Sequence, residues 1–126
     1  MSLDPKGKQL ARVRKHCLAL PQVIEKPAWN TPCFYAGKKI FAMFSDDHHG
    51  DGRIALWLKA PPGMQTMLLQ IAPERVFKPA YVGPYGWIGL HLLANSDQEL
   101  ASHVLDAYRM AAGKKMLAAL EGLTRS

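Results

Sequence analysis

The sequence predicts an α+β fold, with one antiparallel sheet of about five strands and helices packed on one face of the sheet. Three observations support this prediction. Apolar residues near the N-terminus recur at helical spacing, short apolar segments separated by turn residues fill the middle of the chain, and a helix-capping motif precedes the last quarter. The expected order is helix, three strands, helix, two strands, helix (α-β-β-β-α-β-β-α). This order is typical of helices that cover one face of an antiparallel sheet.

The chain has 126 residues, which is the length of a single domain, expected over residues 1–126. Its formal net charge is +6, and residues 1–45 hold all of this excess. A local positive field attracts polyanions, so nucleic acid is a candidate partner, and a basic surface that serves only solubility is the competing interpretation. No apolar run has the length of a membrane span and no signal peptide is recognisable, so we expect a cytoplasmic protein without a membrane partner.

A first helix is predicted over about residues 6–20. Its apolar stripe has the spacing i, i+3, i+7 and i+10 and consists of Leu10, Val13, Cys17 and Leu20. Lys8, Arg12 and Lys15 lie on the opposite side of the helical wheel. Pro21 ends the helix, because the residue before a proline is disfavoured in the helical conformation. The three cations predict either a solvated helix face or a face that follows phosphates.

A bend and a hairpin are predicted next. Trp29 lies in the bend and is expected to cover the core. The strands of the hairpin are expected at residues 32–35 and 38–44, because Ala36-Gly37 favours a two-residue turn. The tip of this hairpin is basic, with Lys38 and Lys39. In the second strand, one face is expected to carry Ile40, Ala42 and Phe44.

The third strand is predicted over residues 53–59. Its aliphatic residues alternate with a second set, in which Trp57 lies between Arg53 and Lys59. Two interpretations of Trp57 remain open. Its ring either stacks on a base or a partner, or it lies beneath a helix with the two cations at the rim.

The second half is predicted to hold a helix over residues 63–71, a second hairpin and a last helix. The second hairpin is expected to have strands at 80–82 and 87–90 around Gly83-Pro84-Tyr85-Gly86, since Gly and Pro favour turns. Its aromatic residues are expected to form a contact surface. Ser96 and Glu99 form a capping box that begins the last helix. The buried stripe of that helix is predicted to be Leu100, Val104, Ala107, Tyr108 and Ala111.

No group of residues predicts an enzyme or a cofactor. The loop Ser45–Gly52 contains three carboxylates and two histidines, but it matches no metal-binding template, and a solvated turn is the favoured interpretation. Cys33 and His91 could be a nucleophile and a base, yet no motif surrounds either residue. A buried cysteine and a strand histidine are the expected roles. We therefore expect no catalytic residue, no bound metal and no small-molecule cofactor.

Several short motifs, in this order, resemble those of the MmcQ/YjbR family over about residues 10–118. They are Leu20-Pro21-Gln22-Val23-Ile24-Glu25, Trp29, Pro32, Gly37-Lys38-Lys39-Ile40-Phe41-Ala42, Leu56-Trp57-Leu58-Lys59, Pro73-Glu74-Arg75-Val76-Phe77, Pro79-Ala80-Tyr81-Val82-Gly83, Gly86-Trp87-Ile88-Gly89 and Asp106-Ala107-Tyr108-Arg109. The resemblance implies a secretion-chaperone-like α+β fold. It also implies a double-wing DNA-binding arrangement, in which two β-hairpins flank a helix. The second wing would be the hairpin tipped by Pro84 and Tyr85. It has no cation at its tip, and its nearest lysine, Lys78, lies at its base.

These observations give two main hypotheses about function. The first is a non-enzymatic DNA-binding protein that contacts mainly phosphates, with little sequence preference and strong salt dependence. The residues assigned to it are Lys8, Arg12, Lys15, Lys38, Lys39, Arg53, Trp57, Lys59, Lys78 and Tyr85, and we expect the cations to gather on one surface. The alternative is a protein-interaction or chaperone-like module, or a homodimer, that uses the hairpin at residues 80–92 with Tyr81, Tyr85 and Trp87. A small-molecule pocket beneath the two hairpins is a third hypothesis.

Overall fold

The computed structural model describes residues 5–125 apart from residues 48, 49 and 51. Six strands form one sheet in the order β1-β2-β3-β4-β6-β5, and all neighbouring strands are antiparallel. The strands are β1 (Val23–Ala28), β2 (Thr31–Ala36), β3 (Lys39–Asp46), β4 (Ile54–Leu58), β5 (Val76–Phe77) and β6 (Ile88–His91). The helices are α1 (Pro5–Cys17), α2 (Met64–Ile71), α3 (Asp97–Ala111) and α4 (Lys114–Arg125), with 3₁₀ turns η2 (Gly83–Tyr85) and η3 (Leu92–Ala94). The α+β prediction is confirmed, with six strands rather than five.

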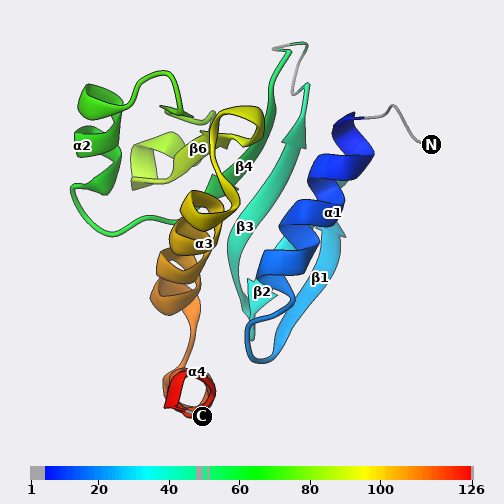
Figure 1. Cartoon of the computed structure of the whole chain (residues 1–126), viewed down its shortest axis with the longest axis vertical. Coiled ribbons are helices and arrows are strands. Elements are labelled where there is room, and N and C mark those ends of the chain that lie inside the picture. Colours follow the sequence, from blue (N-terminus) through cyan, green and yellow to red (C-terminus); the bar gives the residue numbers. More distant parts are fainter. Residues whose placement is uncertain (1–4, 48–49, 51, 126) are drawn as a thin grey trace.

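Helices α1 and α3 lie across one face of the sheet, and α4 lies at the end where α3 stops (Figure 1). The main core fills the space between these helices and the sheet. Buried residues of the sheet such as Phe34, Leu56 and Leu90 pack there against Val13 of α1 and Val104 of α3. The predicted stripe of α3 is confirmed, because all five of its residues are buried, and Leu10, Val13 and Cys17 of α1 also face the core. The predicted end of the first helix at residue 20 is wrong, because α1 ends at Cys17, and Leu20 packs against the core from the turn that follows. None of the described helices is long and apolar enough to cross a lipid bilayer.

Strand β3 contains a bulge that the sequence pattern did not predict. The register between β2 and β3 shifts by one residue at Phe41. As a result, the consecutive residues Phe41 and Ala42 both join the helix-side core. Ile40 therefore packs against the other face of the sheet. The prediction that Ile40 shares a face with Ala42 and Phe44 is wrong, because an inserted residue reverses the alternation of side chains beyond it.

Two strands differ from the sequence prediction. β1 is an edge strand that includes Pro27, and a proline argues against a strand unless the strand lies at an edge. The strand predicted at residues 80–82 does not form, because Tyr81 has a left-handed backbone with φ of 60°. Its place in the second hairpin is taken by β5, whose two residues pair with Leu90 and Gly89 of β6. Residues 78–87, which the prediction placed partly in a strand, therefore form a long connection between β5 and β6.

Tyr108 connects the core to two segments that lie outside it in the sequence. Its hydroxyl donates a hydrogen bond to the carbonyl oxygen of Pro21 at 2.9 Å and lies 3.4 Å from that of Met116 in α4. Its ring packs edge-on against Phe41, with 5.9 Å between the ring centroids. Burial raises the pKa of Tyr108 above its usual value. The residue thus links the start of β1, the bulge in β3 and α4.

The predicted capping box at the start of α3 is also confirmed. The Ser96 hydroxyl accepts a hydrogen bond from the backbone of Glu99 at 3.1 Å, and the Glu99 carboxylate accepts one from the backbone of Ser96 at 2.9 Å. These bonds, and the nearby Arg75, lower the pKa of Glu99. The motif satisfies two backbone donors that a helix start otherwise leaves unpaired.

We expect Tyr108→Phe to lower the free energy of unfolding by about 1–2 kcal/mol, because it keeps the ring but removes the hydroxyl that donates to the Pro21 carbonyl oxygen. Since folding raises the pKa of Tyr108, the hydroxyl contributes fully below the pKa of an unfolded tyrosine, about 10, and its contribution is lost as the pH rises through the folded value. The difference between wild type and variant should therefore narrow at alkaline pH. Denaturant titrations of both proteins at neutral and alkaline pH measure this difference in the free energy of unfolding.

Tyr85→Phe is the matched control, because the Tyr85 ring is 82% exposed. It should change stability by less than about 0.5 kcal/mol. A stability gap for Tyr108→Phe that stays constant across this pH range would contradict the assigned role of the hydroxyl.

Candidate functional site

Arg12, which the sequence assigns to phosphate binding, is instead bound within the fold. Its guanidinium donates hydrogen bonds to Asp97 Oδ1 at 2.5 Å, to the carbonyl oxygen of Leu92 at 2.6 Å and to that of Asn95 at 2.5 Å. The bond to Asp97 is the main reason why the pKa of that carboxyl is lowered. Arg12 therefore holds α1 against the start of α3, and its donors are occupied by the protein itself.

The remaining cations of the predicted set do not share one surface. Lys8 and Lys15 are exposed on α1, which covers the helix side of the sheet. Arg53 and Lys59 flank β4, and both lie over aromatic rings of the opposite face. The expectation of a single basic surface made by these residues is therefore wrong, because the sheet separates them.

The face of the sheet opposite α1 and α3 is closed by a second apolar cluster. Its buried members are Ala55, Trp57, Phe77 and Trp87. The guanidinium carbon of Arg53 lies 4.2 Å from the Phe77 ring centroid, and Lys59 Nζ lies 5.7 Å from the Trp87 ring centroid. Trp87 is 7% exposed, so the prediction that it is a contact residue is wrong. Trp57 is 4% exposed, which favours the buried interpretation, with Arg53 and Lys59 at the rim, over the stacking interpretation. Trp57 is covered by other aromatic residues and not by a helix.

The connection between β5 and β6, residues 78–87, packs on this face and is attached to α2. Gln65 of α2 donates hydrogen bonds to the carbonyl oxygens of Gly83 at 2.8 Å and Trp87 at 2.6 Å. Lys78 is exposed, with its aliphatic chain against Gly83. Tyr81 and Tyr85 are 70% and 82% exposed. This segment is therefore a bound loop with exposed aromatic rings, rather than a projecting β-hairpin.

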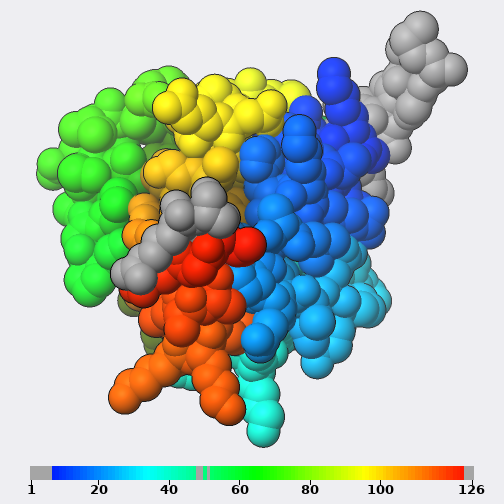
Figure 2. Space-filling view, turned by 60° about the horizontal axis from the view of Figure 1, so that its bottom comes forward, coloured from blue at the N-terminus to red at the C-terminus, as the bar shows by residue number. Residues whose placement is uncertain are grey.

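Four exposed lysines come together at one end of the sheet, which we call the lysine end. Lys38 lies in the turn between β2 and β3, Lys39 begins β3, and Lys114 and Lys115 begin α4. The two segments are adjacent, because a Cβ placed on Gly37 would lie 3.6 Å from Met116 Sδ. Figure 2 shows both segments, cyan and orange, projecting at this end. Within the described part of the chain, none of these four lysines makes an ion pair.

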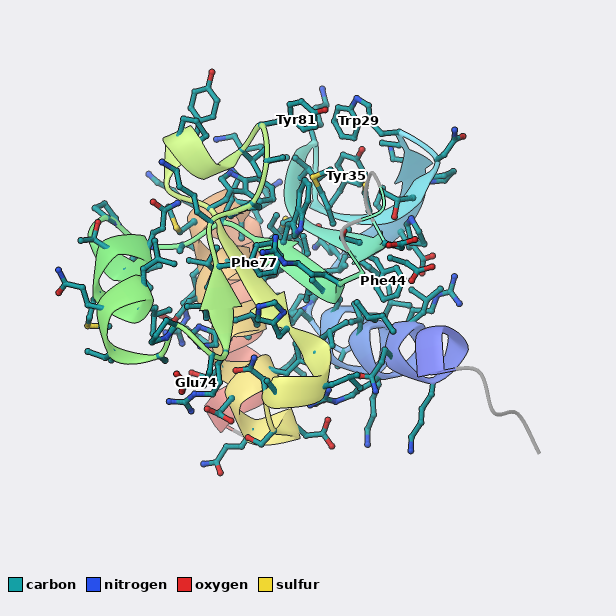
Figure 3. The ribbon with its side chains drawn as sticks, turned by 90° about the horizontal axis from the view of Figure 1, so that it is seen from above. Trp29, Tyr35, Phe44, Glu74, Phe77 and Tyr81 are labelled. Atoms are coloured by element: carbon teal, nitrogen blue, oxygen red, sulfur yellow. The ribbon has the colours of Figure 1, made fainter. Side chains whose placement is uncertain are left out.

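A pocket of about 890 Å³ lies at the opposite end of β2 and β3. We call it the aromatic pocket. The side chains of Trp29 and Tyr81, from the β1–β2 turn and the β5–β6 loop, lie next to each other at this pocket in Figure 3. Its lining residues are Leu10, Trp29, Asn30, Thr31, Pro32, Met43, Phe44, Ser45, Asp46, Trp57, Tyr81 and Val82. Its volume is within the range of small-molecule sites.

Both exposed aromatic residues of the pocket have an unusual backbone. The φ angles of Trp29 and Asn30 are 53° and 60°, and that of Tyr81 is 60°. A positive φ is uncommon in residues other than glycine, and for bulky residues it is a true outlier. Trp29 is 76% exposed, so the prediction that it covers the core is wrong. The third sequence hypothesis, a small-molecule pocket beneath the two hairpins, assigned no residue to that pocket, because the only signal at Trp29 is an aromatic residue at a turn position where Asn-Gly would be ordinary.

The candidate catalytic residues do not meet. Cys33 lies in β2 and His91 in β6, with β3 and β4 between them. The Cys33 thiol is buried, and its single S–H lies within reach of the carbonyl oxygens of Ala28 and Thr31. The His91 ring packs at a tilt against Phe77, with 4.8 Å between the ring centroids. Across the described residues, no three potential metal ligands cluster. His48, His49 and Asp51 of the proposed metal loop lie outside the described residues.

Comparison with known families identifies the fold and its relatives. The sequence profile of the YjbR family matches residues 18–110, most of the chain. The chain belongs to the YjbR family. Among solved structures, it is similar to the Deinococcus radiodurans protein DR2400, whose domain is classed as DUF419. The two sequences are 19% identical, the match covers 89% of this chain and 87% of that chain, and the TM-score of 0.70 shows a common fold. Comparison with curated proteins gave no match.

The two hairpins that the resemblance marks as wings differ in this YjbR protein. The β2–β3 turn is short, basic and exposed, and it has the lysines of α4 beside it. The β5–β6 loop is attached to α2 and has Tyr85 near its tip. The lysine end is therefore a candidate polyanion surface, and the aromatic pocket is a separate candidate ligand site.

We expect neither cysteine of this YjbR protein to react with a thiol reagent in the native state. Both are buried, and desolvation raises the pKa of Cys17 and of Cys33. Absorbance during incubation with Ellman's reagent measures the rate, which should be lower than in denaturant by a factor on the order of 100 or more. Fast modification of Cys33 in the native protein would contradict this expectation and restore Cys33 as a candidate nucleophile.

Proposed function

We propose that this protein is a non-enzymatic DNA-binding protein that contacts the phosphate backbone through the lysine end. The supporting observation is that Lys38, Lys39, Lys114 and Lys115 are exposed on adjacent segments without an ion pair to any described residue. Ammonium groups bind phosphate as point charges and position a protein on DNA without reading bases. A cluster of such charges is what phosphate binding requires.

Lys15 can extend the lysine end. α1 ends at Cys17, and the chain then turns into β1, whose first residue, Val23, pairs with Ala36 beside the β2–β3 turn. The exposed Lys15 therefore belongs to the same end of the sheet. The contacts proposed here are all to phosphates, so we expect little sequence preference and a strong dependence on salt. The separation of Cys33 from His91 supports the non-enzymatic part of the proposal.

A protein-interaction function is the second candidate, and it rests on the exposed Tyr81 and Tyr85. Exposed tyrosines are enriched at protein interfaces. If the chain forms a homodimer through the β5–β6 loop, Tyr85→Ser should weaken the dimer by about 10-fold or more, as measured by sedimentation equilibrium. A wild-type monomer throughout the concentration range would contradict self-association. Trp87 is unsuitable for this test, because its substitution would disrupt the buried cluster.

The salt dependence of duplex binding tests the DNA proposal. If four lysines each neutralise one phosphate, the logarithm of the binding constant should fall against the logarithm of salt concentration with a slope of about −3.6. The double variant Lys38→Gln/Lys39→Gln should reduce this slope by about 2, because two counterions fewer are released. Fluorescence anisotropy with a labelled duplex of mixed sequence measures both slopes.

The matched control is Lys8→Gln/Lys78→Gln, which removes the same net charge from exposed positions outside the lysine end. It should leave the slope close to that of the wild type. An equal loss in both double variants would indicate attraction by net charge alone and contradict a defined site. Absence of binding at low salt would remove the proposal.

A further inference from the structure

We propose that the aromatic pocket binds a planar heteroaromatic small molecule that carries no phosphate or carboxylate, stacked on Trp29 and Tyr81. This proposal is independent of DNA binding, because the pocket and the lysine end are at opposite ends of β2 and β3. A volume of about 890 Å³ accommodates a ring system of two or three fused rings. The inner wall is apolar and includes Met43, Trp57 and Val82.

The backbone at Trp29 and Tyr81 is the first argument for a ligand. Elsewhere most residues at positive φ are glycines, for example Gly37, Gly63 and Gly86, and the two exceptions, Gln22 and Asp47, are not aromatic. At the edges of the pocket it places Trp29 and Tyr81 instead, at the cost of backbone strain and of exposed aromatic surface. Strain of this kind concentrates at ligand-binding positions. The two rings come from different loops and lie on the same pocket (Figure 3).

Ser45 supplies the second argument. Its side chain lies on the pocket side of β3, opposite Ala55 of β4, and the residue is 7% exposed. The Ser45 hydroxyl is buried and has no hydrogen-bond partner among the described residues. A buried hydroxyl without a partner is unfavourable, so a ligand atom that bonds to it gains affinity. A ring with nitrogen or carbonyl groups on its edge meets this requirement, and a pure hydrocarbon does not.

The charges of the lining define the ligand class further. Among the described residues that line the pocket, none is Lys, Arg or His, and Asp46 is acidic. Phosphate and carboxylate groups would find no cation among these described residues, and the negative charge of Asp46 disfavours a second negative charge nearby. The ligand is therefore neutral or cationic. The pocket is thus expected to disfavour nucleotides and nucleic-acid phosphates.

Ligand-observed saturation-transfer NMR tests the proposal with a panel of adenosine, guanosine, riboflavin and indole, and with AMP as the phosphate-bearing match of adenosine. We expect saturation transfer to at least one phosphate-free heteroaromatic compound at millimolar concentration or below, and weaker transfer to AMP than to adenosine. Quenching of tryptophan fluorescence then gives the affinity of the best ligand. No transfer to any member of the panel, or preference for AMP, overturns the proposal.

Trp29→Gly separates binding from folding. Glycine relieves the positive φ, so this variant should unfold at a higher temperature than the wild type, while its affinity falls by about 10-fold or more through loss of stacking. Ser45→Ala should weaken the same ligand several-fold and keep the fold intact. Tyr85→Ser is the control, because it removes an exposed aromatic ring that does not line the pocket, and its affinity should equal that of the wild type.

Unchanged affinity in Trp29→Gly overturns the proposal. One further outcome would indicate that the pocket is a contact surface for a second copy of the chain. In that case the wild type sediments as a dimer, Trp29→Gly sediments as a monomer, and no compound of the panel binds. This result also overturns the small-molecule proposal, and it leaves DNA binding at the lysine end unaffected.

Discussion

The sheet of this protein has two faces, and α1 and α3 cover only one of them. The other face must exclude water by means of its own side chains and of one loop. Trp57 at the centre of β4, with Phe77 and Trp87 around it, forms that cover, and Arg53 and Lys59 lie over the outer rings. Gly89 lies beneath the Phe77 ring, where a Cβ would come within 2.4 Å of the ring. The position of the β5–β6 loop, and with it the edge of the aromatic pocket, depends on this packing.

Strongly periodic parts of the sequence predict the structure well. The stripes of α1 and α3, the capping box of Ser96 and Glu99 and the alternation in β4 all appear as expected. The parts that fail are those where the pattern is weak or locally altered. β1 contains charged residues and a proline, β5 has two residues, and a single inserted residue at Phe41 reverses the facing of Ile40. Such features depend on neighbouring strands, which local sequence does not describe.

The sites were harder to predict than the fold, for a physical reason. Arg12 and Lys15 lie on the same side of a helical wheel. In the folded chain, Arg12 donates hydrogen bonds to Leu92 in η3 and to Asp97 in α3, whereas Lys15 is exposed to solvent. Lys38 and Lys114 are far apart in the chain, and only folding brings their segments together. Trp29 and Trp57 differ in the same way, since one is exposed at a turn and the other buried in the sheet. Residue type predicted the kind of contact, and tertiary structure decided which residues were available for it.

The two edges of the sheet limit how another polypeptide can engage this molecule. β1 carries Glu25, Lys26 and Pro27, and proline offers no N–H to an added strand. β5, at the other edge, has only the two residues Val76 and Phe77. The charged residues and the proline of β1, and the shortness of β5, therefore disfavour the addition of a further strand at either edge. The same features that hinder an added strand from a partner also hinder edge-to-edge aggregation of the molecule with its own copies.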